Sequence, residues 1–207
     1  MKLIVTRRNL MKAGAAGLVA CAARPVFAAP TIIAPVQPKI NPRLMERAKA
    51  ALDSNRRRIR NGDVIAVTDF SQASRFDRFY LVDMIGGMVT AYQVAHGRGS
   101  DPSHSGFLEH FSNAVGSEAT SSGAYLTEDV YYGKYGRSLR LQGLDDTNSN
   151  AEARAIVVHA AKYAEPSMVD HFGKLGRSEG CFALSQLSLQ YVLQRLGPGR
   201  MIYADKL

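Results

Sequence analysis

The stretch "GRSEGC", residues 176–181, places a serine and a cysteine three positions apart, each beside a glycine. One interpretation is Gly176-x-Ser178-x-Gly180, the nucleophile turn of a serine hydrolase built on a doubly wound α/β sheet. The other interpretation makes Cys181, directly behind Gly180, the nucleophile. The choice between them decides the expected fold as well as the chemistry.

The positions of the histidines argue against the serine hydrolase. That turn requires its histidine downstream of the serine, after an acidic residue. Every histidine of the chain precedes Ser178: His96, His104, His110, His159 and His171. The predicted strands also fail to alternate with helices as a doubly wound sheet requires.

Cys181 has better surroundings for chemistry. The attacking species is a thiolate, and its pKa falls beside a histidine or at a helix N-terminus. A helix is predicted a few residues after Cys181, and His159 ends the apolar run "RAIVVHA" (154–160). We therefore predict a Cys181–His159 pair, with a buried structural cysteine as the alternative.

The first 28 residues are typical of an export signal. Basic residues precede a short apolar stretch and a small-residue cleavage pattern that ends at Ala28. The pair Arg7-Arg8 resembles a twin-arginine signal, with an ordinary secretory signal as the alternative. Cleavage before Cys21 would instead leave a lipid-anchored protein. The expected location is the periplasm or cell envelope, where Cys181 would be the single cysteine after cleavage at Ala28 and so without an internal disulfide partner.

Signal removal lowers the formal net charge from +8 to +3, since residues 1–28 hold five basic residues and no acidic one. The remaining surplus lies in residues 39–60, and residues 61–207 are slightly acidic. A nucleic-acid enzyme would not show this distribution, so no nucleic-acid partner is expected. The basic segment, predicted as a helix over 42–60, either contacts an anionic envelope surface or is a solvated helix face.

The pattern along the chain predicts one mainly β domain with a few helices. Residues 29–62 are assigned to a linker and the basic helix, and residues 63–207 to the catalytic domain. Strands are expected at 63–70, 78–84, 88–96, 138–144, 154–160 and 200–204, with a helix at 185–196. The glycine- and serine-rich segment 96–123 is an expected functional loop.

The order of His159 before Ser178-x-Gly180-Cys181 resembles the motif of YkuD-type L,D-transpeptidases. More of the chain is similar to the murein L,D-transpeptidase catalytic domain-like branch. The similar segments are "VAHGRGSD" (94–101), "FSNAVGSEATSSGAYLT" (111–127), "YYGKYGRSLRLQGLD" (131–145), "NAEARAIVVHAAKY" (150–163) and "GRSEGCFAL" (176–184). The resemblance implies an L,D-transpeptidase-type β-sandwich of mixed sheets in a single domain.

The resemblance also implies an activity: transfer of peptidoglycan stem tetrapeptides through a thioester, with 3→3 crosslinking. His159 would take the proton from Cys181, and the carbonyl of Ser178 would orient His159. The implied oxyanion donors are the N–H groups of Glu179, Gly180 and Cys181. The residues expected at the substrate are Arg177, Ser122, Gly123 and His96.

Three departures from the family motif leave alternatives open. Glu179 stands where a second histidine is common, Phe182 where a proline is often found, and Ala183 where an arginine often follows the cysteine. The alternatives are an L,D-carboxypeptidase on the same site and a non-catalytic peptidoglycan-binding module. The loop 96–123, with Phe107 and Phe111, is the expected lid over the thioester. No cofactor is expected, and the histidines lack the spacing of a zinc protease, so no metal is expected either.

Overall fold

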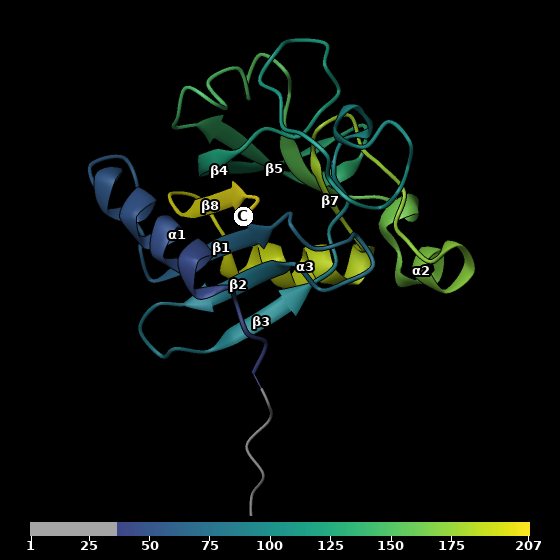
Figure 1. Cartoon of the computed structure of the whole chain (residues 1–207). Coiled ribbons are helices and arrows are strands. Elements are labelled where there is room, and N and C mark those ends of the chain that lie inside the picture. The colour runs from purple at the N-terminus through teal and green to yellow at the C-terminus, as the bar shows by residue number, and fades with distance from the viewer. Residues whose placement is uncertain (1–36) are drawn as a thin grey trace, which may run out of the picture. The chain divides into compact units, whose positions relative to one another are not determined.

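A computed structural model describes residues 37–207 of the chain (Figure 1). The predicted export signal, the lipid-anchor alternative at Cys21 and the linker up to residue 36 lie outside the described residues. The boundary that we expected at residue 63 falls inside one compact unit, since the segment before it packs against the sheet.

Eight strands form one mixed sheet in the order β3-β2-β1-β8-β4-β5-β6-β7. Their bounds are β1 Val64–Asp69, β2 Phe79–Asp83, β3 Val89–Tyr92, β4 Gly123–Gly133, β5 Gly136–Gly143, β6 Val157–Ala160, β7 Phe182–Leu184 and β8 Met201–Asp205. The pairs β1–β8 and β6–β7 are parallel, and the other neighbours are antiparallel. The mainly β prediction is confirmed, with one continuous sheet in place of a sandwich of separate sheets.

Three α-helices accompany the sheet: α1 Pro42–Ser54, α2 Pro166–Phe172 and α3 Gln186–Arg195. Two short 3-10 helices span Arg98–Ser100 and Lys162–Ala164. None of the helices described within residues 37–207 has the length and apolar character needed to cross a membrane.

Helix α1 is shorter than the predicted segment 42–60. Pro42 begins it, and the side chain of Asn41 accepts a hydrogen bond from the N–H of Arg43, which caps the helix. Leu44, Ala48 and Leu52, spaced four apart, are buried against the sheet. The helix ends at Ser54, where Asn55 turns back to bond the carbonyl of Ala51, so the arginines at 56–60 lie beyond it.

The main core lies between the two halves of the curved sheet and α3 (Figure 1). Leu189, Val192 and Leu193 of α3 pack into it from one face of the helix. Phe182, the first residue of β7, is fully buried, with its ring 5.4 Å from that of Tyr125 in an edge-to-face contact. This packing anchors the start of β7, and with it the residue before, Cys181.

Two strands and one helix were missing from the sequence prediction. Strand β4 carries Glu128 and Asp129 at a register shift between Thr127 and Val130, which breaks its alternating pattern. Strand β7 is only three residues long, and its hydrogen-bonded partner β6 lies more than twenty residues earlier. Helix α2 buries none of its side chains, so it has no apolar stripe to predict it.

Candidate active site

The parallel pair β6–β7 brings His159 and Cys181 together. His159 on β6 lies opposite Ala183 on β7, two residues beyond Cys181. Both side chains line one cavity of about 220 Å³. The pairing of a strand with a segment 22 residues later therefore places a base and a thiol at the same edge of the sheet.

Two glycines let the segment before β7 lie against the loop after β3. Gly180 has φ +111°, a conformation that L side chains rarely adopt. A Cβ on Gly97 would stand 2.7 Å from the backbone nitrogen of Gly180 and 2.3 Å from the carbonyl of Glu118. The N–H of Ser178 donates to the carbonyl of His96 at 2.9 Å. The turn before Cys181 is thus fixed by backbone contacts that only glycine permits.

Ser178 holds this turn through its side chain and is not the partner of His159. Its Oγ donates to the carbonyl of Cys181 at 2.7 Å and accepts from the N–H of Gly180 at 3.2 Å. Its own carbonyl accepts from the N–H of Arg98 at 2.8 Å, and Nδ1 of His159 is bonded to the carbonyl of Ala160 instead, so the expected orienting contact from Ser178 to the histidine is wrong. Because the N–H of Gly180 is engaged, the oxyanion donors that remain from the prediction are the N–H groups of Glu179 and Cys181.

The imidazole of His159 is held by the backbone of its own strand. Its Nδ1 lies 2.9 Å from the carbonyl of Ala160, and a carbonyl can only accept, so Nδ1 carries the proton. This leaves Nε2 with a free lone pair, the form that a general base requires. Burial lowers the pKa of His159; the Ala160 carbonyl opposes the shift and the charge of Lys134 adds to it.

The thiol of Cys181 is 8 % exposed and in the resting structure donates to the carbonyl of Ala155 at 3.6 Å. Ala155 has φ +52°, a strained conformation for a residue with a side chain, just before β6. Burial raises the pKa of the thiol, and the Val157 N–H and the charge of Arg154 counteract the rise. These shifts favour a neutral thiol and a neutral imidazole, which line the same cavity in the resting structure.

The cavity around this pair is rich in positive charge. Arg98, Lys134, Arg154 and Arg177 line it, with Glu179 as the one carboxylate among its lining residues. Glu179 pairs with Arg98 at 3.4 Å on the exposed rim. The guanidinium of Arg154 bonds the carbonyls of Ser112 and Ala119 and so tethers the 96–123 loop beside Cys181. Such a cavity is suited to a ligand that carries carboxylates.

The cover of the cavity is the β4–β5 hairpin tip and not the predicted lid. Tyr135 stacks on the ring of His159, with 4.3 Å between ring centroids, and the ammonium of Lys134 lies 4.7 Å from the Tyr135 ring. From the loop 96–123 the cavity takes only Arg98. Phe111 of that loop packs on the core instead, 5.9 Å from Phe70. Hydrogen bonds from Arg177 to the carbonyl of Asp101 and from Arg154 to the carbonyl of Ser112 pin the loop to the domain.

A sequence model of the L,D-transpeptidase catalytic domain matches residues 36–204, most of the chain. The chain belongs to the L,D-transpeptidase catalytic domain family. The resemblance inferred from the five segments is thereby confirmed, and the matched region includes α1.

Solved L,D-transpeptidase structures are also similar to the chain. One from Mycobacterium tuberculosis H37Rv shares 15% identity over 69% of this chain and 57% of its own, with a TM-score of 0.43. One from Mycobacterium smegmatis shares 15% identity over 70% of this chain and 59% of its own, with a TM-score of 0.41. The structure of LdtMt1 in complex with imipenem shares 16% identity over 69% of this chain and 59% of its own, with a TM-score of 0.41. The chain spans less than two thirds of each structure, and no curated protein sequence matches it.

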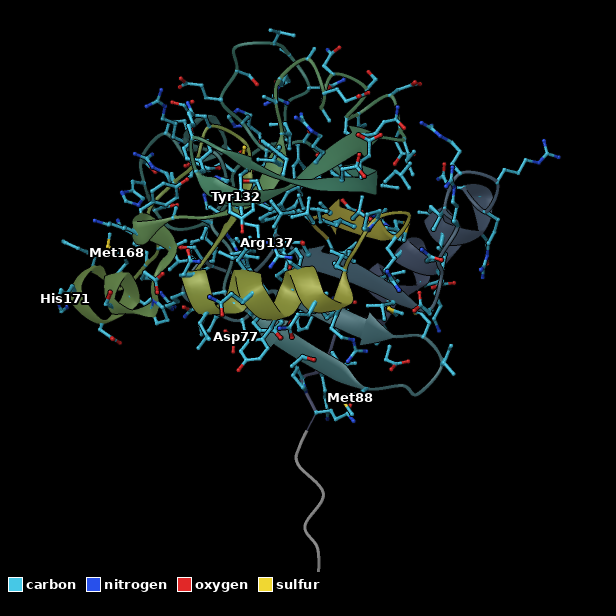
Figure 2. All side chains as sticks on the ribbon, turned by 180° about the vertical axis from the view of Figure 1, so that it is seen from behind. Asp77, Met88, Tyr132, Arg137, Met168 and His171 are labelled. Atoms are coloured by element: carbon cyan, nitrogen blue, oxygen red, sulfur yellow. The ribbon has the colours of Figure 1, made fainter. Side chains whose placement is uncertain are left out.

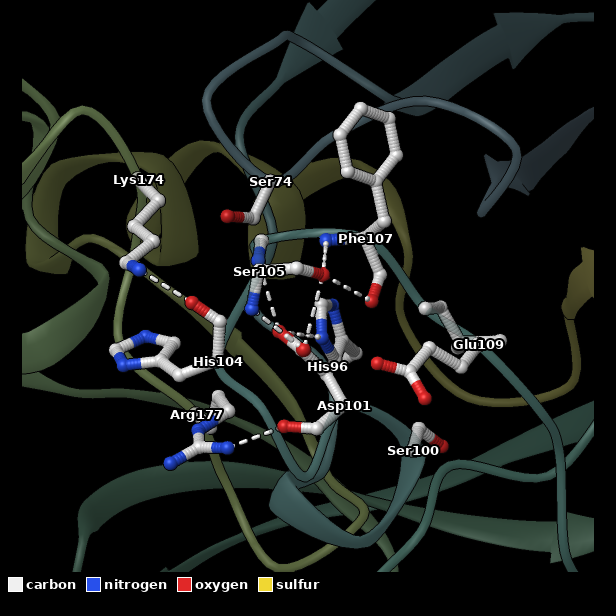
Figure 3. A network of polar contacts seen from close by, with 12 residues as sticks. Ser74, His96, Ser100, Asp101, His104, Ser105, Phe107, Glu109, Lys174 and Arg177 are labelled. Carbon is white, nitrogen blue, oxygen red and sulfur yellow. Dashed lines mark hydrogen bonds and ion pairs between the residues drawn. The ribbon is translucent and has the colours of Figure 1, made fainter.

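His96 is not available to a substrate of this L,D-transpeptidase domain, contrary to the prediction. It is 1 % exposed, with Nδ1 2.7 Å from Nη2 of Arg78 and Nε2 3.3 Å from a carboxylate oxygen of Asp101. Figure 3 shows this carboxylate also bonded by the loop around Ser105. Arg78 is fully buried, and its guanidinium bonds the carbonyls of Gln72 and Val94. The network is part of the domain's interior.

Ser122 and Gly123 lie at the start of β4, outside the residues that line the cavity, so the structure does not bring them to Cys181. Gly123 has φ +108°, and a Cβ there would stand 2.5 Å from the carboxylate of Asp145. The carbonyl of Ser122 accepts from the hydroxyl of Thr147 at 2.9 Å. The glycine serves a close approach between β4 and the turn after β5.

Arg177 does line the cavity, and its guanidinium bonds the carbonyls of Asp101 and Pro102 (Figure 3). Sequence reasoning gave no role to the other cavity residues Arg98, Lys134, Tyr135, Arg154 and Tyr163. All five lie within the segments that carry the family resemblance. Their presence there was the available signal, but nothing in their spacing indicates that they face Cys181.

Proposed function

We propose that the protein is an exported L,D-transpeptidase that joins peptidoglycan stem peptides through a thioester on Cys181. The observation that supports this most is the placement of the Cys181 thiol and the His159 imidazole in one cationic cavity. Family membership supplies the reaction class, and the free Nε2 of His159 supplies a base of the correct tautomer.

In the first half-reaction, Nε2 of His159 takes the proton of the Cys181 thiol after the side chain turns away from Ala155. The thiolate attacks the carbonyl at the L-centre of the third stem residue, and the N–H groups of Glu179 and Cys181 hold the oxyanion. The C–N bond then breaks, His159 returns the proton to the leaving amine, and D-alanine departs. A thioester remains on Cys181.

In the second half-reaction an amine from a neighbouring stem attacks the thioester. His159 accepts the proton from this amine, and the thiolate leaves as the new amide forms. Attack by water would yield a tripeptide instead, so the outcome depends on excluding water. Tyr135, stacked on the ring of His159, would shield that face of the imidazole from water.

The charges of the cavity support a stem peptide as substrate. Stem peptides carry several free carboxylates, and Lys134, Arg154 and Arg177 line the cavity with no ion-pair partner among the described residues. Arg98, the fourth cation, is paired with Glu118 and Glu179. Arg154 and Lys134 also lower the pKa of Cys181 against the effect of burial. The same charges that bind the substrate therefore favour the thiolate.

Export to the periplasm or cell envelope is part of the proposal, because its substrate is an envelope polymer. A peripheral contact between the α1 segment and anionic envelope material also belongs to it. Arg47 of α1 pairs with Asp205, and Arg56 pairs with Asp53. Among the described residues, the charge without an ion-pair partner in this segment lies on Lys39, Arg43, Lys49, Arg57, Arg58 and Arg60.

The test is incubation of the full chain with disaccharide tetrapeptides, followed by separation of the muropeptides by liquid chromatography and mass spectrometry. We expect 3→3 dimers, free D-alanine and an acyl adduct on the intact protein. Cys181→Ser should abolish the adduct, whereas Ser178→Ala, which removes only a turn contact, should retain part of it. An imipenem adduct that depends on Cys181 would support the same assignment.

The products separate this function from its alternatives. Tripeptide monomers without dimers would identify an L,D-carboxypeptidase on the same site. An adduct on the Cys181→Ser protein would refute Cys181 as the nucleophile. Binding of muropeptides without any turnover would identify a non-catalytic peptidoglycan-binding module.

A further inference from the structure

A second cavity of about 440 Å³ adjoins the first, between the β4–β5 hairpin tip and α3. Its lining side chains are Tyr132, Tyr135, Arg137, Gln186, Gln190 and Gln194. Tyr135 lines both cavities and forms the wall between them. Figure 2 shows Tyr132 and Arg137 extending from the hairpin towards α3. We call this second cavity the hairpin groove.

The floor of the hairpin groove is a stripe of amides. Gln186, Gln190 and Gln194 are four residues apart and so lie on one face of α3, exposed, beside the face that packs into the core. The exposed face of α1 carries charged residues instead, such as Arg43, Glu46 and Lys49. The α3 stripe therefore presents donors and acceptors without charge.

The upper wall of the hairpin groove is aromatic. Tyr132 and Arg137 are directly opposite each other on β4 and β5, so their side chains share one face of the hairpin. Tyr132 is 82 % exposed, an unusual state for a large aromatic ring in a groove. An exposed ring with amides facing it presents a flat apolar surface and hydrogen-bonding groups to the same ligand.

The two adjoining cavities differ in charge. Four cations line the catalytic cavity, while the hairpin groove has Arg137 alone and no carboxylate among its lining residues. Peptidoglycan has the same division: the stem peptide carries carboxylates, and the glycan carries uncharged hydroxyl and acetamido groups. The reacting centre lies three residues along the stem from the sugar, about 10 Å in an extended chain. Adjoining cavities match such a separation.

We propose that the hairpin groove binds the N-acetylated hexosamine glycan of the substrate whose stem occupies the catalytic cavity. The inference rests on the proposed function for the identity of that stem. The glutamine amides donate to and accept from hydroxyl and acetamido groups, and Tyr132 packs on a sugar face. Arg137 supplies a fork of further donors to the acetamido carbonyl.

Direct binding tests the hairpin groove without any catalysis. Chitotetraose, an uncharged tetramer of N-acetylglucosamine, is titrated into the full chain and followed by calorimetry and tyrosine fluorescence. Tyr132→Ala and Gln190→Ala should each weaken binding about fivefold, the loss of one aromatic or hydrogen-bonded contact. Tyr191→Ala removes an exposed tyrosine of α3 outside the hairpin groove and should leave the affinity unchanged.

Kinetics gives the second readout. D-alanine release is compared between a disaccharide tetrapeptide and the free tetrapeptide. The wild-type chain should prefer the disaccharide form in KM by about tenfold, and Tyr132→Ala should remove the preference by raising the KM for the disaccharide form more than the KM for the free tetrapeptide.

The two proposals fail in different ways. Absence of turnover on both substrates would overturn the proposed function. The chitotetraose titration alone would then decide whether the hairpin groove binds the glycan. No binding of chitotetraose together with equal KM values for both substrates would overturn the glycan inference and leave the function standing. Binding that Tyr191→Ala weakens as much as Tyr132→Ala would overturn it too.

Discussion

Two histidines of this domain, His159 and His96, look alike by burial and differ in what their rings can do. Each is 1 % exposed, and burial lowers the pKa of each. The ring of His96 has both nitrogens engaged, with Arg78 on Nδ1 and Asp101 on Nε2. The ring of His159 has Nδ1 engaged by Ala160, and its remaining face lies under Tyr135 beside the cavity.

The comparison teaches that a free ring nitrogen, and not burial or a shifted pKa, marks the candidate base. Because Arg78 can only donate, Nδ1 of His96 must accept, and Nε2–H must donate to Asp101. His96 therefore has no lone pair left for a substrate. Arg78 stays charged at neutral pH even though burial lowers its pKa to about 9. The network stabilises the segment around His96, whose carbonyl accepts the hydrogen bond from the N–H of Ser178.

Replacing the two rings by glutamine should give the largest contrast. His159→Gln removes the base, and we expect kcat/KM for D-alanine release to fall about a thousandfold. His96→Gln keeps an acceptor for Arg78 and a donor for Asp101, so its activity should stay within about tenfold of wild type. Steady-state rates on disaccharide tetrapeptide measure both. Equal losses in the two variants would show that the distinction between the rings is wrong.

Truncation of the His96 ring to alanine should lower the stability of the domain. His96→Ala leaves the buried charges of Arg78 and Asp101 without their shared partner, and we expect the free energy of unfolding to fall by about 2–4 kcal/mol. His110→Ala, at an exposed histidine, is the control and should change it by less than about 0.5 kcal/mol. Urea denaturation followed by circular dichroism gives the values. A His96→Ala protein as stable as the control would contradict a structural role for this ring.

The pH dependence of stability should sharpen the comparison by a smaller amount. Burial, with the charge of Arg78 adding to it, lowers the pKa of His96 from 6.5 to about 3 in the folded state. Between these values the unfolded chain binds one more proton at this position, so stability falls as the pH falls, by up to about 1.4 kcal/mol per pH unit. His96→Gln should lose that part of the slope between pH 6 and 4. Parallel slopes for variant and wild type would show that His96 titrates normally.

The features that sequence alone predicted are those that produce a pattern among residues close together in the chain. The apolar spacing of Leu44, Ala48 and Leu52 predicted a helix, and the β-branched run before His159 predicted a buried strand. The order of His159 and Cys181, within five similar segments, predicted the family. These inferences succeeded because burial on one side of an element leaves a period in the sequence, and because reacting groups sit in recognisable motifs.

The errors concern residues whose role depends on distant partners. His96, Ser122 and Gly123 occur in segments that resemble the family, yet contacts with Arg78, Thr147 and Asp145 make them structural. The lid prediction was wrong for the same reason: Phe111 is as apolar as a cover should be, but it packs against Phe70 and the core and does not line the cavity.

The sequence by itself determined the family and the mainly β class, and it identified Cys181 and His159 as the candidate nucleophile and base. Only the tertiary structure decided which residues surround that pair. The parallel pairing of β6 with β7 puts the thiol and the imidazole in one cavity, and the hairpin tip brings Lys134 and Tyr135 over it. A sequence states which groups are present. The partners that form hydrogen bonds with a ring nitrogen or cover a cavity come from far along the chain, and only folding brings them into contact.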